Sequence, residues 1–283
     1  MPELPEVEAA SRHLRAWLSG HRIERARAAR TRVLRGQAPQ RFAALKGHRL
    51  ERIERFGKWM LLSFDGGEGL ISHLGMTGKW VRRRADEPLT GHTRATLELD
   101  DGLAVDYRDP RLFGLLLRGK TERLRVLPSL TQLGPDPLPA IDVERLHSML
   151  SRTRRSLKEA LMDQRTLAGL GNIYVVEALH RAKLDPRRAG TTLSVEETRR
   201  LAGAILDTLQ AALVEEAGDE PITYVEEGGE NVFRVYDRGG LPCLACATPI
   251  RRIVQGGRST FYCPACQAGG RRLRGKRKVV SRA

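Results

Sequence analysis

The first three residues, Met1-Pro2-Glu3, place a secondary amine and a carboxyl group at the start of the chain. Removal of the initiator methionine, which is usual before a small residue such as proline, makes the Pro2 nitrogen the new terminus. An α-amino group has a pKa near ~8, against ~10.4 for lysine, so part of it is neutral at physiological pH. Neutral amines form Schiff bases with aldehydes, and a neighbouring carboxyl can shuttle protons. The sequence therefore predicts a nucleophile at Pro2 and an acid–base group at Glu3.

Four cysteines near the other end of the chain have the spacing of a metal site. They follow the pattern C-x2-C-x16-C-x2-C, as Cys243, Cys246, Cys263 and Cys266. Two cysteine pairs at this spacing are typical of one zinc ion held by four thiolates. Strand-like segments at 250–254 and 260–262 predict a hairpin between the pairs, with Arg258 near its tip. Because protein thiolates fill all four positions, we expect this Zn²⁺ to be structural and assign it no chemical step.

Three further motifs place residues of possible function in turns. Two glycines precede Asn172 at a predicted helix start, where backbone N–H groups can bind phosphate, although many such corners are only structural. Met76 and Phe113 each lie in a glycine-bounded turn, which suits an apolar wedge that unstacks bases; burial beneath a sheet is the alternative. Lys58 lies in a turn between two predicted strands, where exposure to solvent is the default expectation for a lysine.

These residues need a scaffold, and the hydrophobic pattern predicts its first half. An amphipathic helix is predicted over residues 5–19, with Pro5 in its first turn. Short strand-like runs then alternate with Asp- and Gly-rich turns, at 49–56, 59–64, 70–74, 95–99, 103–106 and 115–118. This many short strands favour a β-sandwich, which we assign to residues 1–132.

The second half of the chain is predicted to be helical. A proline-rich linker at 133–140 leads to helices at 143–150, 156–162, 173–182 and 194–216. Ser194 and Glu197 form a capping-box signature at the start of the last of them. We divide this half into a helical domain, a zinc ribbon and a basic tail expected to be disordered, at 141–240, 241–268 and 269–283. A loop at 217–240 joins the last helix to the ribbon.

Charge and composition point to the class of partner. The chain has 283 residues, a hydrophobic fraction of 41% and a net charge of +15, and no apolar run approaches a membrane span. Residues 243–283 hold ten Lys or Arg and no Asp or Glu, and residues 1–58 hold fourteen against six. Concentrated basic charge indicates a polyanion partner, unless it only reflects a coding bias towards arginine. Charged residues where a signal peptide needs an apolar run predict the cytoplasm.

Six motifs occur together in the order found in one known family: residues 1–8, 73–78, 109–114, 161–164, 169–174 and the four cysteines. Over roughly residues 1–266 the chain resembles the bacterial formamidopyrimidine-DNA glycosylases, which repair oxidised purines by base excision. The resemblance implies an α+β fold: a β-sandwich with flanking helices, then a helix–two-turn–helix domain carrying the zinc ribbon. It further implies a monomer on the bacterial nucleoid that binds double-stranded DNA containing oxidised bases or abasic sites, without any membrane.

The resemblance also implies catalytic roles. Pro2 would be the Schiff-base nucleophile that attacks C1′ of the damaged nucleotide, with Glu3 as its proton donor. Lys58 would be the acid in β-elimination, and Arg258 the residue linked to δ-elimination. By the same resemblance, a further set of residues would contact DNA: His92, Arg111, Arg154, Lys158 and Asn172. A trio would fill the gap left by the flipped base: Met76, Arg111 and Phe113.

Three departures from the family pattern leave alternatives open. The expected lesion-capping loop carries five acidic residues between 217 and 231. Leu112 stands where a second basic residue is common in the family. Residues 267–283 continue beyond the point where family members usually end. One alternative is therefore the same chemistry with a preference for oxidised pyrimidines or abasic sites. Another is a non-catalytic DNA-binding protein that uses the zinc ribbon as a clamp. The joint presence of Pro2, Glu3 and Lys58 disfavours the second.

Overall fold

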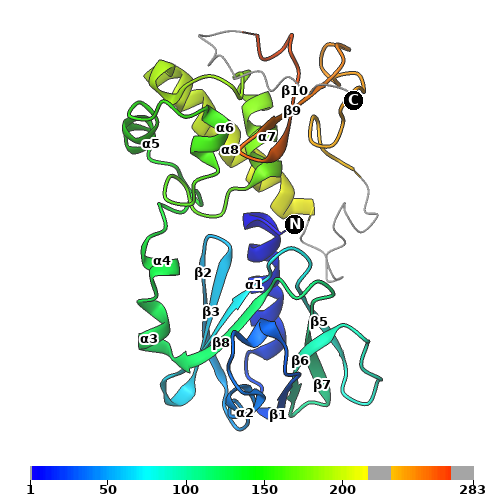
Figure 1. The fold of residues 1–283 in the computed structure, drawn as a ribbon. Coiled ribbons are helices and arrows are strands. Elements are labelled where there is room, and N and C mark those ends of the chain that lie inside the picture. Colours follow the sequence, from blue (N-terminus) through cyan, green and yellow to red (C-terminus); the bar gives the residue numbers. More distant parts are fainter. Residues whose placement is uncertain (1, 216–230, 269–283) are drawn as a thin grey trace, which may run out of the picture. The chain divides into compact units, whose positions relative to one another are not determined.

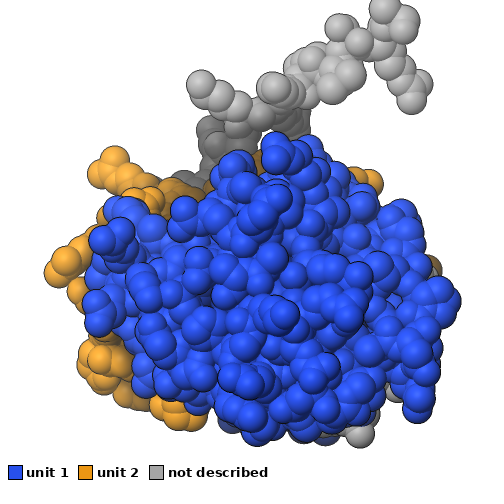
Figure 2. Space-filling view, turned by 90° about the horizontal axis from the view of Figure 1, so that it is seen from below, with its two compact units in different colours: residues 1–136, 167–170, 209–231 blue, residues 137–166, 171–208, 232–283 orange. Residues whose placement is uncertain are grey.

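The computed structural model describes residues 2–215 and 231–268 of the chain. These residues form two compact units, coloured separately in Figure 2. The first unit comprises residues 1–136 together with two later pieces, 167–170 and 209–231, and the second unit comprises the remainder. The tail at 269–283 and most of the loop at 217–240 lie outside the described residues.

The first unit contains two four-stranded antiparallel sheets (Figure 1). One sheet has the order β1 (Ile23–Ala28), β6 (Thr93–Leu99), β7 (Leu103–Arg108), β5 (Lys79–Arg84). The other has the order β2 (Leu50–Phe56), β3 (Trp59–Phe64), β4 (Glu68–His73), β8 (Leu115–Lys120). The inward side chains of both sheets join one hydrophobic cluster, to which Met60, Leu97 and Val105 belong. The predicted β-sandwich is confirmed.

Helix α1 (Leu4–Leu18) completes this core, one residue earlier in the chain than predicted. Val7, Leu14 and Leu18 recur at helical spacing and are buried in the same cluster as the strands. Glu3 is the N-cap residue, and its amide donates to Glu6 Oε2 at 2.8 Å, which satisfies one of the free N–H groups of the helix start. The helix therefore begins at the residues that the sequence singles out for chemistry.

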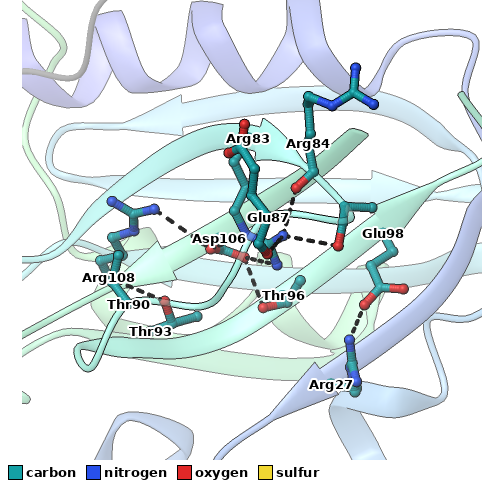
Figure 3. A network of polar contacts seen from close by, with 11 residues as sticks. Arg27, Arg83, Arg84, Glu87, Thr90, Thr93, Thr96, Glu98, Asp106 and Arg108 are labelled. Carbon is teal, nitrogen blue, oxygen red and sulfur yellow. Dashed lines mark hydrogen bonds and ion pairs between the residues drawn. The ribbon is translucent and has the colours of Figure 1, made fainter. Parts of the chain in front are cut away.

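Two strands, β1 and β5, were not predicted from the sequence. In β5 four of the six residues are Lys or Arg, so the strand lacks the apolar alternation by which strands are recognised. One of these arginines, Arg83, is buried, but on the opposite face of its sheet from the hydrophobic cluster, to which Trp80 of the same strand belongs. It forms an ion pair with Asp106 of β7 at 2.8 Å, and Thr96 Oγ1 of β6 donates to the same carboxylate at 2.8 Å (Figure 3). The outer face of this sheet thus carries a buried charged pair.

We expect Arg83→Met to destabilise the first unit by about 3 kcal/mol, because it removes the nearer cation of the buried Asp106 carboxylate and leaves it only Arg108 at 3.8 Å. Urea unfolding followed by tryptophan fluorescence would measure the loss, since Trp80 lies on the same strand and is buried. Arg84→Met is the matched control, because Arg84 is exposed and its ion pair with Asp86 lies on the surface. Equal unfolding midpoints for the two variants would contradict the expectation.

The second unit is helical, as predicted. Its main helices are α5 (Val143–Leu150), α6 (Leu157–Leu161), α7 (Asn172–Arg181) and most of α8 (Val195–Glu215). The predicted capping box of α8 is confirmed, since Glu197 N donates to Ser194 Oγ at 3.1 Å and Ser194 N donates to a Glu197 carboxylate oxygen at 3.0 Å. The predicted hairpin forms as β9 (Arg251–Gln255) and β10 (Arg258–Tyr262). With the four-cysteine cluster beside it, this unit completes the predicted α+β fold.

Short elements connect the rest of the described chain: α2 (Pro39–Ala43), α3 (Thr121–Arg125), α4 (Pro128–Thr131) and the 3-10 turns η1 (Arg32–Leu34), η2 (Asp65–Gly67) and η3 (Gly190–Thr192). Among the described residues no helix combines the length and apolar character needed to cross a membrane.

Candidate functional site

The start of α1 is enclosed by protein. Pro2 and Glu3 are both buried, and the Leu4 amide donates to the Gly169 carbonyl at 3.0 Å. The two residues that the sequence predicts as nucleophile and acid–base group therefore lie together at an enclosed helix start.

Close backbone packing connects the turn that carries Lys58 to this helix start. Gly57 has a φ of +56°, and a Cβ at this position would lie 2.9 Å from the Gly169 nitrogen. Gly169 has a φ of +94°, and a Cβ there would lie 2.8 Å from Leu4 Cβ. Only glycine permits both approaches. The first unit therefore brings the half-buried Lys58 towards the same segment that contacts Leu4, next to Pro2 and Glu3.

His73 is a half-buried histidine beside this turn, and sequence reasoning assigned it no role. Burial first, and the positive charges of Lys58 and Arg35 second, lower the pKa of His73 to about 4. Its Nδ1 accepts from the Gly75 amide at 3.0 Å, and its ring lies 4.4 Å from that of Trp59. The ring is thus neutral at physiological pH and adds no positive charge beside Lys58. The motif at 73–78 is the one sequence signal that points to it.

The turns that carry Met76 and Phe113 are joined to each other. A Cβ on Gly75 would lie 2.5 Å from the Phe113 carbonyl, so the two backbones touch. Buried Asp109 holds both turns, because one carboxylate oxygen accepts from Thr77 Oγ1 at 2.8 Å and the other accepts from the Gly114 amide at 2.8 Å. The two turns therefore form one rigid support.

The support presents its predicted DNA-binding side chains to solvent. Phe113 is 45% exposed, Met76 is half-buried and Arg111 is exposed, so Phe113 is not a core residue beneath the sheet. His92 is exposed in the turn before β6, and its carbonyl accepts from the Asp109 amide at 3.0 Å. Asp109 thus links the segments that carry Met76, His92, Arg111 and Phe113, although the sequence did not identify it as a site residue.

Four other predicted site residues lie in the second unit. Asn172, the first residue of α7, donates from its side chain to the Ser259 carbonyl of β10 at 2.9 Å. Lys158 is only 1% exposed and donates to the Gln255 carbonyl at 3.2 Å. Arg258 is exposed directly after the Gly256–Gly257 turn, and Arg154 is exposed before α6. Asn172 and Lys158 therefore hold the hairpin that presents Arg258.

The four cysteine sulfurs fit a zinc ion. They all lie within 4.8 Å of one another and form no disulfide. The Cys243–Cys266 sulfurs are separated by 3.9 Å and the Cys246–Cys263 sulfurs by 3.4 Å, close to the ~3.8 Å edge of a tetrahedron with Zn–S bonds of ~2.3 Å. His180 Nε2 of α7 lies 3.6 Å from Cys243 Sγ. Zinc at this position would fold the ribbon against α7 and would take no part in the chemistry.

Glu177 is a third residue that sequence reasoning missed, after His73 and Asp109. Its carboxylate accepts from the amides of residues 234, 235 and 236, at 3.0, 2.8 and 2.8 Å. Burial raises the pKa of Glu177, while these three hydrogen bonds oppose the shift. The residue anchors the chain on its way into the ribbon. A lone glutamate inside a helix carries no sequence signal for such a role.

Comparison with known proteins gives matches along most of the chain. Residues 1–116 match the formamidopyrimidine-DNA glycosylase N-terminal domain, residues 133–222 match the H2TH domain of that enzyme, and residues 240–269 match a zinc finger found in FPG and IleRS. A formamidopyrimidine-DNA glycosylase of Azorhizobium caulinodans is 42% identical over 94% of this chain and 100% of the relative. That of Thermus thermophilus is 40% identical over 95% and 100%.

Solved structures of the same family are similar to this chain over most of its length. The crystal structure of the MutM (Fpg) protein from Thermus thermophilus has a TM-score of 0.80 at 38% identity, covering 95% of this chain and 100% of that one. The Lactococcus lactis protein in complex with FAPY-dG-containing DNA has a TM-score of 0.84 at 30% identity, covering 94% and 100%. MutM in complex with carbocyclic 8-oxo-G-containing DNA also has a TM-score of 0.84 at 30% identity, covering 95% and 100%.

Proposed function

Because this chain belongs to the formamidopyrimidine-DNA glycosylase family, we propose that it excises oxidised purines, 8-oxoguanine and formamidopyrimidines, from double-stranded DNA and then nicks the strand at the abasic site. The observation that carries the proposal is the buried start of α1, where Glu3 caps the helix directly after Pro2 and the Lys58 turn packs against the Gly169 segment. A family member that only binds DNA has no need of an enclosed amine and carboxyl at this position.

In the proposed mechanism the Pro2 nitrogen forms a bond to C1′ while the glycosidic bond breaks and its electron pair leaves with the base. The Pro2 nitrogen loses its proton as the sugar ring opens to a Schiff base, and Glu3 passes a proton to the ring oxygen. Loss of a C2′ proton to water then expels the 3′ phosphate, with Lys58 as the acid that assists the departing oxygen. A second elimination, to which we assign Arg258, releases the 5′ phosphate, and water finally hydrolyses the Schiff base and frees Pro2. The zinc ion holds the ribbon and takes no step.

The exposed support around Asp109 suits a protein that flips a base. Extrusion of a nucleotide costs a few kcal/mol of stacking and pairing, so the vacated space must be filled. We assign Phe113 as the wedge and Met76 as the filler. Arg111, with five planar donors, suits the orphaned partner base better than lysine does. We further assign phosphate or base contacts to His92, Arg154 and Asn172, and to Lys158 a role through the hairpin that it holds.

Activity on a panel of duplexes, each with one lesion, tests the proposal. We expect 8-oxoguanine and formamidopyrimidine duplexes to be cleaved faster than duplexes with an oxidised pyrimidine, and borohydride to trap the protein on each cleaved substrate. Faster cleavage of oxidised pyrimidines would favour the alternative left open by the acidic segment at 217–231. Tight binding without any trapping would favour a non-catalytic protein.

The domain boundaries at residues 132, 140, 240 and 268 stay predictions. We propose that the protein works in the cytoplasm, on the nucleoid.

The seven Lys and Arg residues at 271–282 lie outside the described residues, and we propose that they lie along duplex DNA. Each phosphate neutralised steepens the dependence of log affinity on log salt by ~0.9.

Truncation after Gly270 should therefore weaken binding to damaged and undamaged duplex alike and flatten the salt slope, since phosphate contacts carry no lesion information. Binding titrations at several salt concentrations measure this, with single-turnover cleavage at saturating enzyme as the control, which should barely change. An unchanged slope would leave the tail without a role in binding. Selective loss of lesion cleavage would place it at the reacting nucleotide instead.

A further inference from the structure

Arg32, in the 3-10 turn η1, grips the backbone of the turn that carries Phe113. Its Nε donates to the Leu112 carbonyl at 2.8 Å, and its Nη2 donates to the Arg111 carbonyl at 2.6 Å. The guanidinium therefore uses its planar fork to hold two successive carbonyls of a segment far away in the sequence.

The backbone at Arg111 and Leu112 needs these hydrogen bonds because of its conformation. Leu112 has a φ of +58°, in the left-handed region that residues with a side chain rarely adopt. Backbone of this kind persists only where its surroundings hold it. The Leu112 side chain packs against the hydrophobic core of the sandwich, and Asp109 fixes the Gly114 amide. The Arg111 amide donates to Thr77 Oγ1 at 3.4 Å, and exposed Arg32 supplies two further hydrogen bonds.

The same guanidinium lies against the Phe113 ring. Arg32 Cζ is 5.0 Å from the ring centroid, and Arg111 Cζ is also 5.0 Å from it, both within the range of a cation–π interaction. An exposed phenylalanine would otherwise be free to change rotamer. Two guanidinium groups contact the ring and restrict its movement.

We propose that Arg32 is a positioning residue that presents Phe113 as a rigid wedge for the base stack. This inference rests on the proposed function, because it names how the flipped nucleotide's space is filled. With Arg32 in place, the free protein already holds the ring and its strained backbone in position, so little ordering is needed when DNA binds. Lysine cannot replace it, since one ammonium group cannot donate to both carbonyls and lie flat on the ring.

The test compares Arg32→Ala and Arg32→Lys with Arg30→Ala, a matched control that removes the same charge from an exposed arginine two residues away. In the free protein, hydrogen exchange of the amides at 111–114 should become faster in both Arg32 variants and stay unchanged in Arg30→Ala. With a lesion duplex that carries 2-aminopurine beside the lesion, the rise of fluorescence on unstacking should slow by about tenfold to a hundredfold in both Arg32 variants. Cleavage of a single-stranded abasic oligonucleotide, which has no stack to open, should stay within about twofold of wild type.

Two outcomes would overturn the inference: Arg32 variants that behave like Arg30→Ala in exchange and unstacking, or an equal loss of single-stranded cleavage, which would place Arg32 at the reacting sugar. Failure of the proposed function looks different. In that case the wild-type protein itself would neither unstack the duplex nor cleave it, while the difference in hydrogen exchange between the Arg32 and Arg30 variants would remain.

Discussion

Blocking the Pro2 nitrogen should reduce borohydride trapping on abasic-site DNA by orders of magnitude while leaving DNA binding largely intact. Retention of Met1, or a short extension before Pro2, turns this nitrogen into an amide that cannot form a Schiff base. It also adds chain where Pro2 is buried at the start of α1. Pro2→Gly should have a similar effect, because glycine loses the ring that restrains the amine.

A cleavable extension provides the control for this experiment. Its removal directly before Pro2 should restore trapping in the same preparation, which separates loss of the nucleophile from misfolding. Binding to an uncleavable abasic analogue, measured on both forms, should change little. Full trapping by protein in which mass spectrometry shows Met1 or the extension intact would exclude Pro2 as the attacking amine.

Loss of one zinc ligand should have the second large effect. Four thiolates on one zinc contribute an apparent binding free energy of about 10–16 kcal/mol, which is also folding free energy for the ribbon. Cys263 is buried, and its amide donates to Gln267, which in turn donates to the Leu184 carbonyl. Cys263→Ser should therefore lose zinc and DNA affinity together, while the sandwich stays folded.

Metal analysis, DNA titration and the tryptophan-monitored unfolding of the first unit measure the three parts of this expectation. Leu244→Ser is the matched control, since Leu244 lies between two ligands and is 63% exposed. It should keep one zinc per chain and bind DNA normally. Pure, active wild-type protein with almost no zinc would disprove the assignment, as would Cys263→Ser with zinc and affinity unchanged.

Local patterns were the part of the structure that the sequence could predict. The capping box at Ser194 involves groups three residues apart, and the cysteine pairs have a spacing set by one ion. Strands with apolar alternation were found, whereas β5 was missed because four of its six residues are Lys or Arg, one of them buried in an ion pair. A charge that is buried opposite a partner from another strand looks, in sequence, like an exposed one.

In the candidate site, too, local patterns were predictable and contacts between distant segments were not. Its predicted residues came from motifs, but the groups that position them act across long sequence separations. Asp109, Arg32 and Glu177 each bind backbone atoms, which carry no residue identity, so no pattern of side chains reveals them. The burial of Lys158 is also invisible in sequence, since the hairpin carbonyl that it binds lies almost a hundred residues later.

The first unit includes residues that are far apart in the sequence, and this has a consequence for folding during protein synthesis. All eight strands of the sandwich have been synthesised before Gly169 is made, yet the Leu4 amide needs the Gly169 carbonyl, and the Gly57 turn packs on the same residue. A nascent chain can thus fold its sheets while the end that carries Pro2 is still unfinished. Translation that stops before Gly169 would release a sandwich in which the start of α1 lacks the backbone contacts that enclose it.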